Sequence, residues 1–173
     1  PAATTPVYIA NYNAGSLDWT QSEITSHLTC STEGCCYVAA TASVLAFWDD
    51  YQYTQRGPFE GLVQTGNGTD QSAVSSLATE VYNNVAWGGG CWGDMGCSYQ
   101  IASGVDTVSS DKRYLFSENW YGFPSESVAT TEVANNRPYI WMVGGYNYGE
   151  ISIDHVMACV GYTYDSTYGL KLS

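Results

Sequence analysis

Two adjacent cysteines, Cys35 and Cys36, stand at the start of a long apolar segment that closes at Asp49. The segment is rich in alanine and has no charge or helix breaker before Asp49, a pattern that is typical of a buried helix. A thiol on the first turn of a helix lies near the positive end of the helix dipole and near amide N–H groups without partners, and both lower the pKa of a thiol. The pattern therefore favours a nucleophilic thiol at one of these two positions.

The chain contains two histidines, and only His155 lies where it could serve such a nucleophile. It stands near the start of an apolar segment, residues 154–162, whose alternation predicts a strand with residues 155, 157 and 159 on one face. A thiol at a helix start and an imidazole on a later strand form a pair used in nucleophilic catalysis, because the imidazole takes the proton of the thiol. His27 lies on an expected helix, and we expect it to face solvent or to cap a carbonyl group.

The elements that must hold these residues begin with helices. Ser16 and the pair Thr69-Asp70 are suitable N-caps for two of them. Residues 1–15 are expected to be extended, and residues 98–123 to form strands or one more short helix. The predicted helices cover residues 16–28, 34–51, 70–85 and 124–136.

After Pro138 the hydrophobic period changes to that of strands. Helices followed by an antiparallel sheet make an α+β fold. The length suits a single domain, residues 1–173, with a helical part at about residues 1–105 and a sheet part at 106–173. A turn is expected at residues 144–149. The predicted strands cover residues 139–143, 154–162 and 168–172.

Residues 87–97 are too rich in glycine for regular structure and predict a surface loop that displays Trp87 and Trp92. We expect a disulfide between Cys91 and Cys97 to tie this loop. Six cysteines in an acidic chain with few lysines indicate an oxidising, extracellular setting. The protein is therefore expected to be secreted.

The charge balance argues against two classes of partner. The formal net charge is −12 with only five lysines and arginines, so the chain has no basic surface for nucleic acid or anionic lipid heads. No apolar run approaches the roughly 20 residues of a membrane helix. We expect neither a nucleic-acid partner nor membrane insertion.

Three stretches of the chain resemble a known family. They are residues 36–49 (CYVAATASVLAFWD), residues 132–140 (EVANNRPYI) and residues 154–162 (DHVMACVGY). In this order they are similar to the nucleophile helix, the helix-to-strand junction and the His strand of papain-like cysteine peptidases, particularly the branch similar to bacteriocin-processing, double-glycine peptidases. The resemblance implies a papain-like α+β fold, with the nucleophile helix in an N-terminal helical lobe and the His in a C-terminal antiparallel sheet lobe. It implies no metal and no organic cofactor.

Aligning the apolar end of the helix with the family puts the nucleophile at Cys36. If the glycine-rich loop holds its own disulfide and Cys30 pairs with Cys35, then Cys36 and Cys159 remain as thiols. A competing pairing of Cys30 with Cys36 would leave Cys35 free and would exclude a peptidase.

Papain-like sites usually have a Gln a few residues before the nucleophile, where it helps to stabilise the oxyanion. Residues 28–35 contain none, and Gln21 is the nearest candidate. Tyr37 matches the place of an aromatic residue in such sites, and we expect it to contact substrate together with Trp87 and Trp92.

The family usually orients the His with an Asn or Asp at the start of the next strand. Asp165 is the only carboxylate between His155 and Ser173, and we expect it in the turn after Tyr162. The orienting residue is therefore not evident.

The expected activity is hydrolysis of peptide bonds in a peptide or protein substrate. Cys36 attacks the carbonyl, His155 accepts and returns the proton, and the Cys36 N–H, with Gln21, stabilises the oxyanion. Water then releases the acyl-enzyme. Two other classes fit the same residues: a non-catalytic papain-fold module that binds peptide or glycan, and an extracellular adhesion domain that uses Cys36 for a covalent bond.

Overall fold

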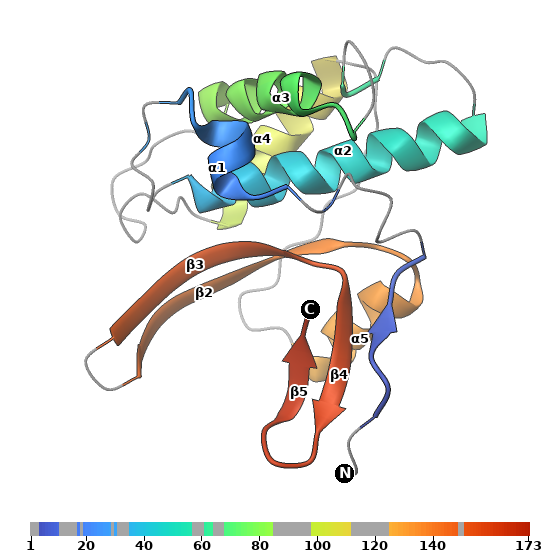
Figure 1. Ribbon diagram of the computed structural model, residues 1–173, viewed down its shortest axis with the longest axis vertical. Coiled ribbons are helices and arrows are strands. Elements are labelled where there is room, and N and C mark those ends of the chain that lie inside the picture. Colours follow the sequence, from blue (N-terminus) through green and yellow to red (C-terminus); the bar gives the residue numbers. More distant parts are fainter. Residues whose placement is uncertain are drawn as a thin grey trace.

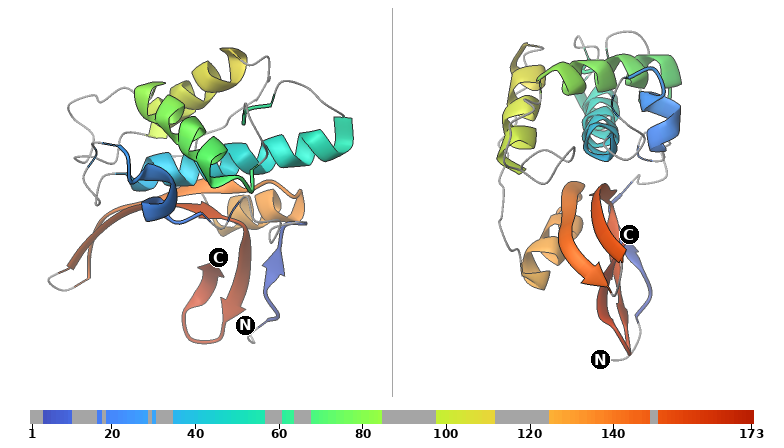
Figure 2. Two further views of the ribbon diagram at one scale, coloured as in Figure 1. Left: turned by 45° about the horizontal axis from the view of Figure 1, so that its top comes forward. Right: turned by 90° about the vertical axis from the view of Figure 1, so that its left-hand side faces the viewer.

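In a computed structural model, a layer of helices packs against a layer of strands (Figure 1). The described residues are 4–10, 17, 19–28, 30, 35–56, 61–63, 68–84, 98–111, 125–148 and 151–173. Helices α1 to α4 lie on one side, and the strands with α5 lie on the other, as both views of Figure 2 show. Helices followed by antiparallel strands confirm the expected α+β class.

The central element of the helical layer is α2, which covers Cys36–Arg56. Every residue from Cys35 to Phe47 is buried, and none carries a charge, because an unpaired buried charge is costly. The helix packs against α1, α3 and β3. It continues beyond its predicted end at Tyr51 and stops ahead of Pro58, whose ring is incompatible with a helix interior.

Helix α1 (Gln21–Thr25) is shorter than the predicted helix over residues 16–28. It begins after Thr20, so the predicted N-cap at Ser16 is wrong. The Thr20 N–H and hydroxyl both donate to Glu23 Oε2, at 2.8 and 2.6 Å, and these bonds lower the pKa of the Glu23 carboxyl. A Thr followed three residues later by a Glu is a stronger signal for a helix start than an isolated Ser.

Helix α3 covers Gln71–Asn84, close to the predicted range. Asp70 caps it as expected, since its carboxylate accepts the N–H groups of Ser72 at 3.0 Å and Ala73 at 3.2 Å. The apolar residues that recur at helical spacing form the buried face of this helix. The residues of that face are Val74, Leu77, Ala78 and Val81.

Helix α4 covers Ser98–Asp111, where the sequence left strands or one more short helix open. It packs against α3, with Ile101 and Val108 in the core. Residue 105, the expected border between the helical part and the sheet part, lies within this helix.

Helix α5 covers Glu126–Ala134, and its junction with the next strand is closely held. Asn136 adopts a left-handed φ of 56°, and its Oδ1 accepts the Ala10 N–H at 2.9 Å. The Arg137 N–H donates to the Glu132 carbonyl, and its guanidinium donates twice to the Glu132 carboxylate. That ion pair lowers the pKa of Glu132.

Strands β2 (Tyr139–Tyr148) and β3 (Ile151–Cys159) form an antiparallel pair. Their register shifts between Val143 and Tyr146. The predicted turn at residues 144–149 is therefore wrong, because the chain stays in the strand through this glycine pair and forms a bulge. Glycines between apolar residues fit a bulge as well as a turn.

The strand expected at residues 154–162 is divided, because β3 ends at Cys159 and the next strand joins a second sheet. A Cβ added to Gly161 would lie 2.6 Å from the carbonyl oxygen of Val7, so glycine allows this close approach of the N-terminal segment. That segment is extended, as predicted, over its described residues. The second sheet contains, in order, β1 (Val7–Tyr8), β4 (Gly161–Asp165) and β5 (Gly169–Leu172).

Two buried clusters hold the layers together. The first cluster joins helices α1 to α4 to β3, to which it is connected by Val156. The second is smaller and contains Ile9, Phe47 and Val133. Because Phe47 belongs to α2, this helix contributes to both clusters.

Candidate active site

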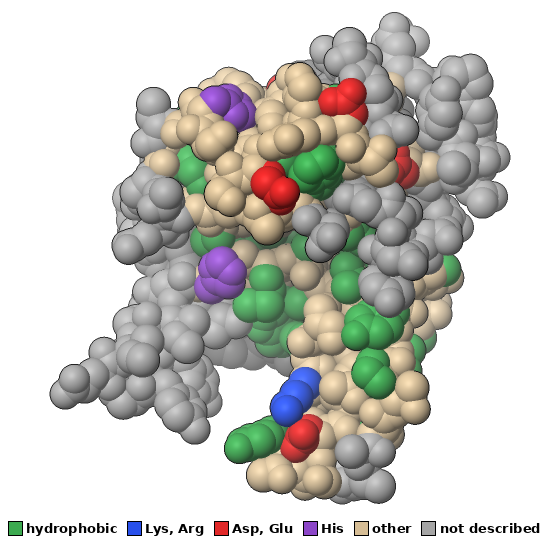
Figure 3. All heavy atoms as spheres, viewed as in Figure 1, with side chains coloured by type: hydrophobic (Ala, Val, Ile, Leu, Met, Phe, Trp, Pro, Cys, Tyr) green, Lys and Arg blue, Asp and Glu red, His purple; other side chains and the backbone are tan. Residues whose placement is uncertain are grey.

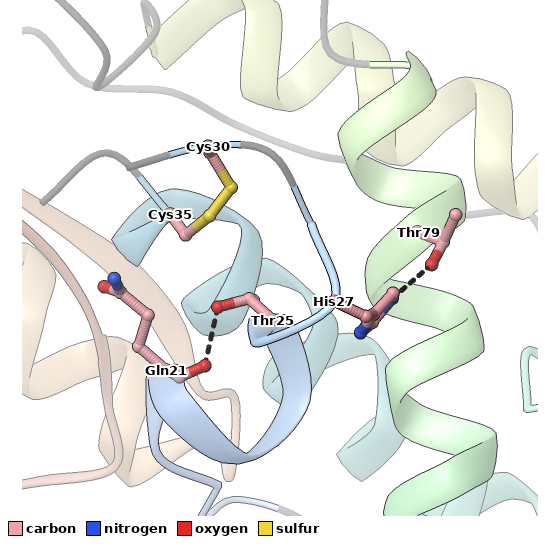
Figure 4. Close-up of a disulfide and its surroundings, with 6 residues drawn as sticks. All are labelled: Gln21, Thr25, His27, Cys30, Cys35 and Thr79. Atoms are coloured by element: carbon pink, nitrogen blue, oxygen red, sulfur yellow. Dashed lines mark hydrogen bonds between the residues drawn. A yellow bond between two sulfur atoms is a disulfide. The ribbon is translucent and has the colours of Figure 1, made fainter. Parts of the chain in front are cut away.

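Cys36 is the first residue of α2 and has a free thiol. Its neighbour Cys35 forms a disulfide with Cys30, with the Cα atoms 5.7 Å apart (Figure 4). This is the pairing that leaves Cys36 free, and the competing pairing of Cys30 with Cys36 is wrong. The Cys35 carbonyl accepts the Ala39 N–H at 3.0 Å, so helical hydrogen bonding begins directly before the thiol.

The fold brings the helix of Cys36 against the strand of His155. The Cys36 side chain is 3% exposed and belongs to the first buried cluster. The same cluster contains Val156 of β3. His155 directly precedes Val156 in the chain and is exposed. The two candidate residues are therefore held on elements that pack together, although they are far apart in sequence.

The side chains of Cys36 and His155 are not joined by a hydrogen bond in the described part of the chain. Val156 and Ala158 pack toward the first cluster, so strand alternation places His155 on the other face of β3. Figure 3 shows histidine side chains at the surface of this view. Catalytic hydrogen bonds are often long before substrate binds, so the packing of α2 on β3 is the informative geometry.

Gln21 is the first residue of α1 and is partly buried. Its carbonyl accepts the Thr25 hydroxyl at 2.6 Å. In Figure 4 its side chain lies on the disulfide side of α1, whereas His27 points toward α3. There His27 Nε2 forms a 2.7 Å hydrogen bond with Thr79 Oγ1. His27 is exposed, and this contact is with a hydroxyl and not with a carbonyl.

The structure contradicts the expectation that Tyr37 contacts substrate. Its side chain is 1% exposed and packs inside the first cluster, because the residue after the helix start points into the helical layer. Trp87, Trp92 and the expected disulfide between Cys91 and Cys97 lie outside the described residues.

Asp165 is committed to the turn between β4 and β5, as expected. Its Oδ1 accepts the N–H groups of Thr167 at 2.8 Å and Tyr168 at 3.1 Å, and its Oδ2 accepts the Lys171 ammonium at 3.1 Å. These bonds, led by the one from Thr167, lower the pKa of the Asp165 carboxyl. This carboxylate does not orient His155.

The second free thiol, Cys159, lies in an environment unsuited to a nucleophile. It is fully buried and pairs across the sheet with Tyr139. Burial raises the pKa of the Cys159 thiol to about 12, and it also raises the pKa of Tyr139. The sequence does not predict this pair. Which residues of β2 and β3 lie opposite each other depends on where β2 ends and the chain turns back.

Comparison with known families shows to which family this chain is related. The sequence model of the Peptidase_C39 like family matches residues 18–170. The chain belongs to this family. No curated protein and no solved structure matches the chain.

Membership in the Peptidase_C39 like family confirms the resemblance to bacteriocin-processing peptidases. The matched range includes both Cys36 and His155. A Peptidase_C39 like protein is expected to be a cysteine peptidase that acts on peptides or proteins, although the family is also compatible with a non-catalytic member.

The described residues contain neither a candidate metal site nor a candidate membrane helix. Within those parts, no group of His, Cys, Asp and Glu side chains is arranged to hold a metal ion. Among the described helices, none is both long and apolar enough to cross a membrane.

Proposed function

We propose that this chain is a secreted cysteine peptidase that hydrolyses peptide bonds through an acyl-enzyme on Cys36. In this proposal residues 1–173 form a single papain-like domain. Its helical lobe carries the nucleophile on α2, and its sheet lobe carries the general base on β3. Family membership supports the reaction class, and the positions of Cys36 and His155 support their roles.

In the proposed mechanism, the Cys36 thiolate attacks the substrate carbonyl and His155 holds the proton of the thiol. The Cys36 N–H, assisted by Gln21, stabilises the negative charge that develops on the carbonyl oxygen. His155 then gives the proton to the leaving amine. It next takes a proton from the water that hydrolyses the thioester, which restores the free thiol.

One observation carries the proposal. Of the adjacent cysteines at the start of α2, Cys35 is used by a disulfide and Cys36 is free. The free one begins a helix that packs on the strand of His155.

The test compares the full chain with its Cys36→Ala variant. Each is treated with iodoacetamide under non-reducing conditions, mapped by peptide mass, and assayed against a peptide library. We expect alkylation of Cys36 to be much faster than that of Cys159, and cleavage to require Cys36. A Cys36 thiol that stays unmodified in the folded protein, or cleavage that survives in Cys36→Ala, contradicts the proposal.

A second candidate is favoured by two observations. The Cys36 side chain is almost fully buried, and the carboxylate of Asp165 is engaged in a turn. Both fit a non-catalytic papain-fold module that binds peptide or glycan, or an adhesion module that forms a covalent bond through Cys36. Rapid alkylation of Cys36 without any turnover of the library favours these two over the peptidase.

A further inference from the structure

We propose that the Cys30–Cys35 disulfide positions the two groups that stabilise the oxyanion. The inference rests on the proposed peptidase function and adds to it the means by which the site is held. One oxyanion donor is the Cys36 N–H on α2, and the other is Gln21 on α1. Cys30 and Cys35 are positioning residues in this scheme, since neither touches the substrate.

The disulfide acts directly on the first donor. The Cys36 N–H belongs to the planar peptide group that begins at the Cys35 carbonyl. Cys35 is 1% exposed, is bonded to Cys30, and accepts the Ala39 N–H. A residue held at its side chain and at its carbonyl has little freedom to rotate, so the direction of the next N–H is fixed as well.

The second donor depends on the placement of α1. This helix has only five residues, too few to be stable alone. Two hydrogen bonds tie it to α3: His27 to Thr79 at 2.7 Å, and Gln71 Nε2 to the Glu23 carbonyl at 2.8 Å. Cys30 follows α1 in the chain, so the disulfide adds a covalent tie between the α1 side and the first turn of α2.

Both oxyanion donors must be held in place, because oxyanion stabilisation is sensitive to distance. Donors act when they lie about 2.7–3.1 Å from the oxyanion, and losing one donor lowers kcat by about 10²–10³. A misplacement of about 1 Å can cost a factor of about 10². Without the disulfide, α1 and the start of α2 are held by packing and by the intervening chain but by no covalent tie, and we expect kcat to fall by about 10 to 100-fold.

The disulfide is a weak candidate for a purely structural role. It closes a loop with a sequence separation of only five residues, and short loops gain the least from cross-linking the unfolded chain. The first cluster, which surrounds Cys36, is formed from several helices and a strand and does not depend on this bond. The fold is therefore expected to survive its removal.

The experiment measures kcat, KM, the melting temperature and the rate of Cys36 alkylation in the Cys30→Ala/Cys35→Ala double variant. We expect kcat to fall 10 to 100-fold, while KM and the alkylation rate change by less than about threefold, because thiol reactivity does not require the oxyanion donors. Val133→Ala is the matched control, since it loosens the second cluster and leaves the site intact. It should lower the melting temperature without changing kcat.

Gln21→Ala separates positioning from general stability. It should lower kcat in the chain that has the disulfide and have little further effect in the double variant, because there Gln21 is already misplaced. Unchanged kcat in the double variant, or fully multiplicative effects of the two changes, overturns the inference and leaves the peptidase proposal standing. A wild-type chain without turnover overturns both.

Discussion

Cys36 at the first turn of α2 shares a buried cluster with Val156, the residue that follows His155 on β3. The packing contact of α2 on β3 defines the candidate site more firmly than either chemical side chain, since it holds the helix against the strand. His155 stands on the opposite face of β3 from this cluster, so the strand and not a direct contact links the imidazole to the thiol. Because α2 packs on β3, residues from the early part and the late part of the matched range 18–170 come together in the candidate site.

Replacing His155 by Ala should abolish turnover with little loss of stability. The side chain is exposed, so its removal leaves no cavity. Loss of the general base should lower kcat by about 10³-fold or more and slow the alkylation of Cys36. Steady-state kinetics and a thermal melt check this. Thr163→Ala on β4 is the control, since it removes only a hydrogen bond to the Thr4 carbonyl. Retention of activity in His155→Ala would exclude this residue as the base.

Replacing Asp165 by Ala should leave turnover unchanged within about twofold. Its carboxylate holds the turn between β4 and β5 through Thr167, Tyr168 and Lys171, so the variant should melt at a slightly lower temperature. Loss of a residue that orients the His costs about 10⁴ in kcat. A fall of that size in kcat would show that Asp165 reaches His155 during turnover, contrary to its position here.

The stability of the protein should fall at alkaline pH through the buried pair Tyr139 and Cys159. The pKa of Cys159 is raised to about 12 in the folded state. The contribution of this thiol to the stability of the fold is therefore complete below the pKa of the thiol in the unfolded chain, which is near 8.5. It is lost as pH rises toward 12. At pH 10 the loss should be about 2 kcal/mol, because the unfolded thiol is by then about 1.5 pH units above its own pKa.

Urea unfolding at pH 8 and pH 10 measures this loss, and Cys159→Ala is the comparison. The variant should lose some stability at both pH values because it removes a buried group. Its free energy of unfolding should change less between the two. Equal pH dependence in the two proteins would mean that the thiol is not perturbed.

Replacing Gly61 by Ala should destabilise the fold by about 1–3 kcal/mol. The added Cβ would lie 2.5 Å from Asp49 Oδ1 and 2.9 Å from the Val63 carbonyl oxygen. Asp49 is buried on α2 and accepts the Leu62 N–H at 2.6 Å, so it cannot move aside freely. Urea unfolding measures the cost.

A double-mutant cycle with Asp49→Ala identifies the source of the strain. In that background Gly61→Ala should cost less, although part of the clash with Val63 remains. Gly169→Ala is the matched control, because its penalty comes from a φ of 77° with no atom nearby and should add independently. Additive effects of Asp49→Ala and Gly61→Ala would mean that the two residues are not in contact.

The sequence predicted best those elements whose patterns are long and unambiguous. Cys36 to Trp48 has no polar side, and so α2 and its burial follow from composition. Asp70 before an apolar helical face marked α3 in the same way. The family resemblance put the nucleophile at Cys36, whereas the cysteine count left two pairings open, and the structure has the one that leaves Cys36 free.

Elements whose position depends on distant contacts could not be predicted in this way. The glycines after Val143 permit a turn or a bulge, and pairing with β3 selects the bulge. The break between Cys159 and Gly161 reflects β4 joining β1 instead of β2. Tyr37 is expected from the family resemblance to contact substrate, but its burial could not be predicted, because the direction of a side chain on the first turn of α2 depends on which helices surround it.

The pairing of β1 with β4 has a consequence for the order in which the chain folds. Val7 and Tyr8 lie opposite Tyr162 and Gly161, so this contact closes almost the whole chain into a loop. Contacts of such long sequence separation form late, because their entropy cost comes before any gain. During synthesis, the segments of α1 to α4 leave the ribosome well before β4. The nucleophile helix can therefore fold before the second sheet closes.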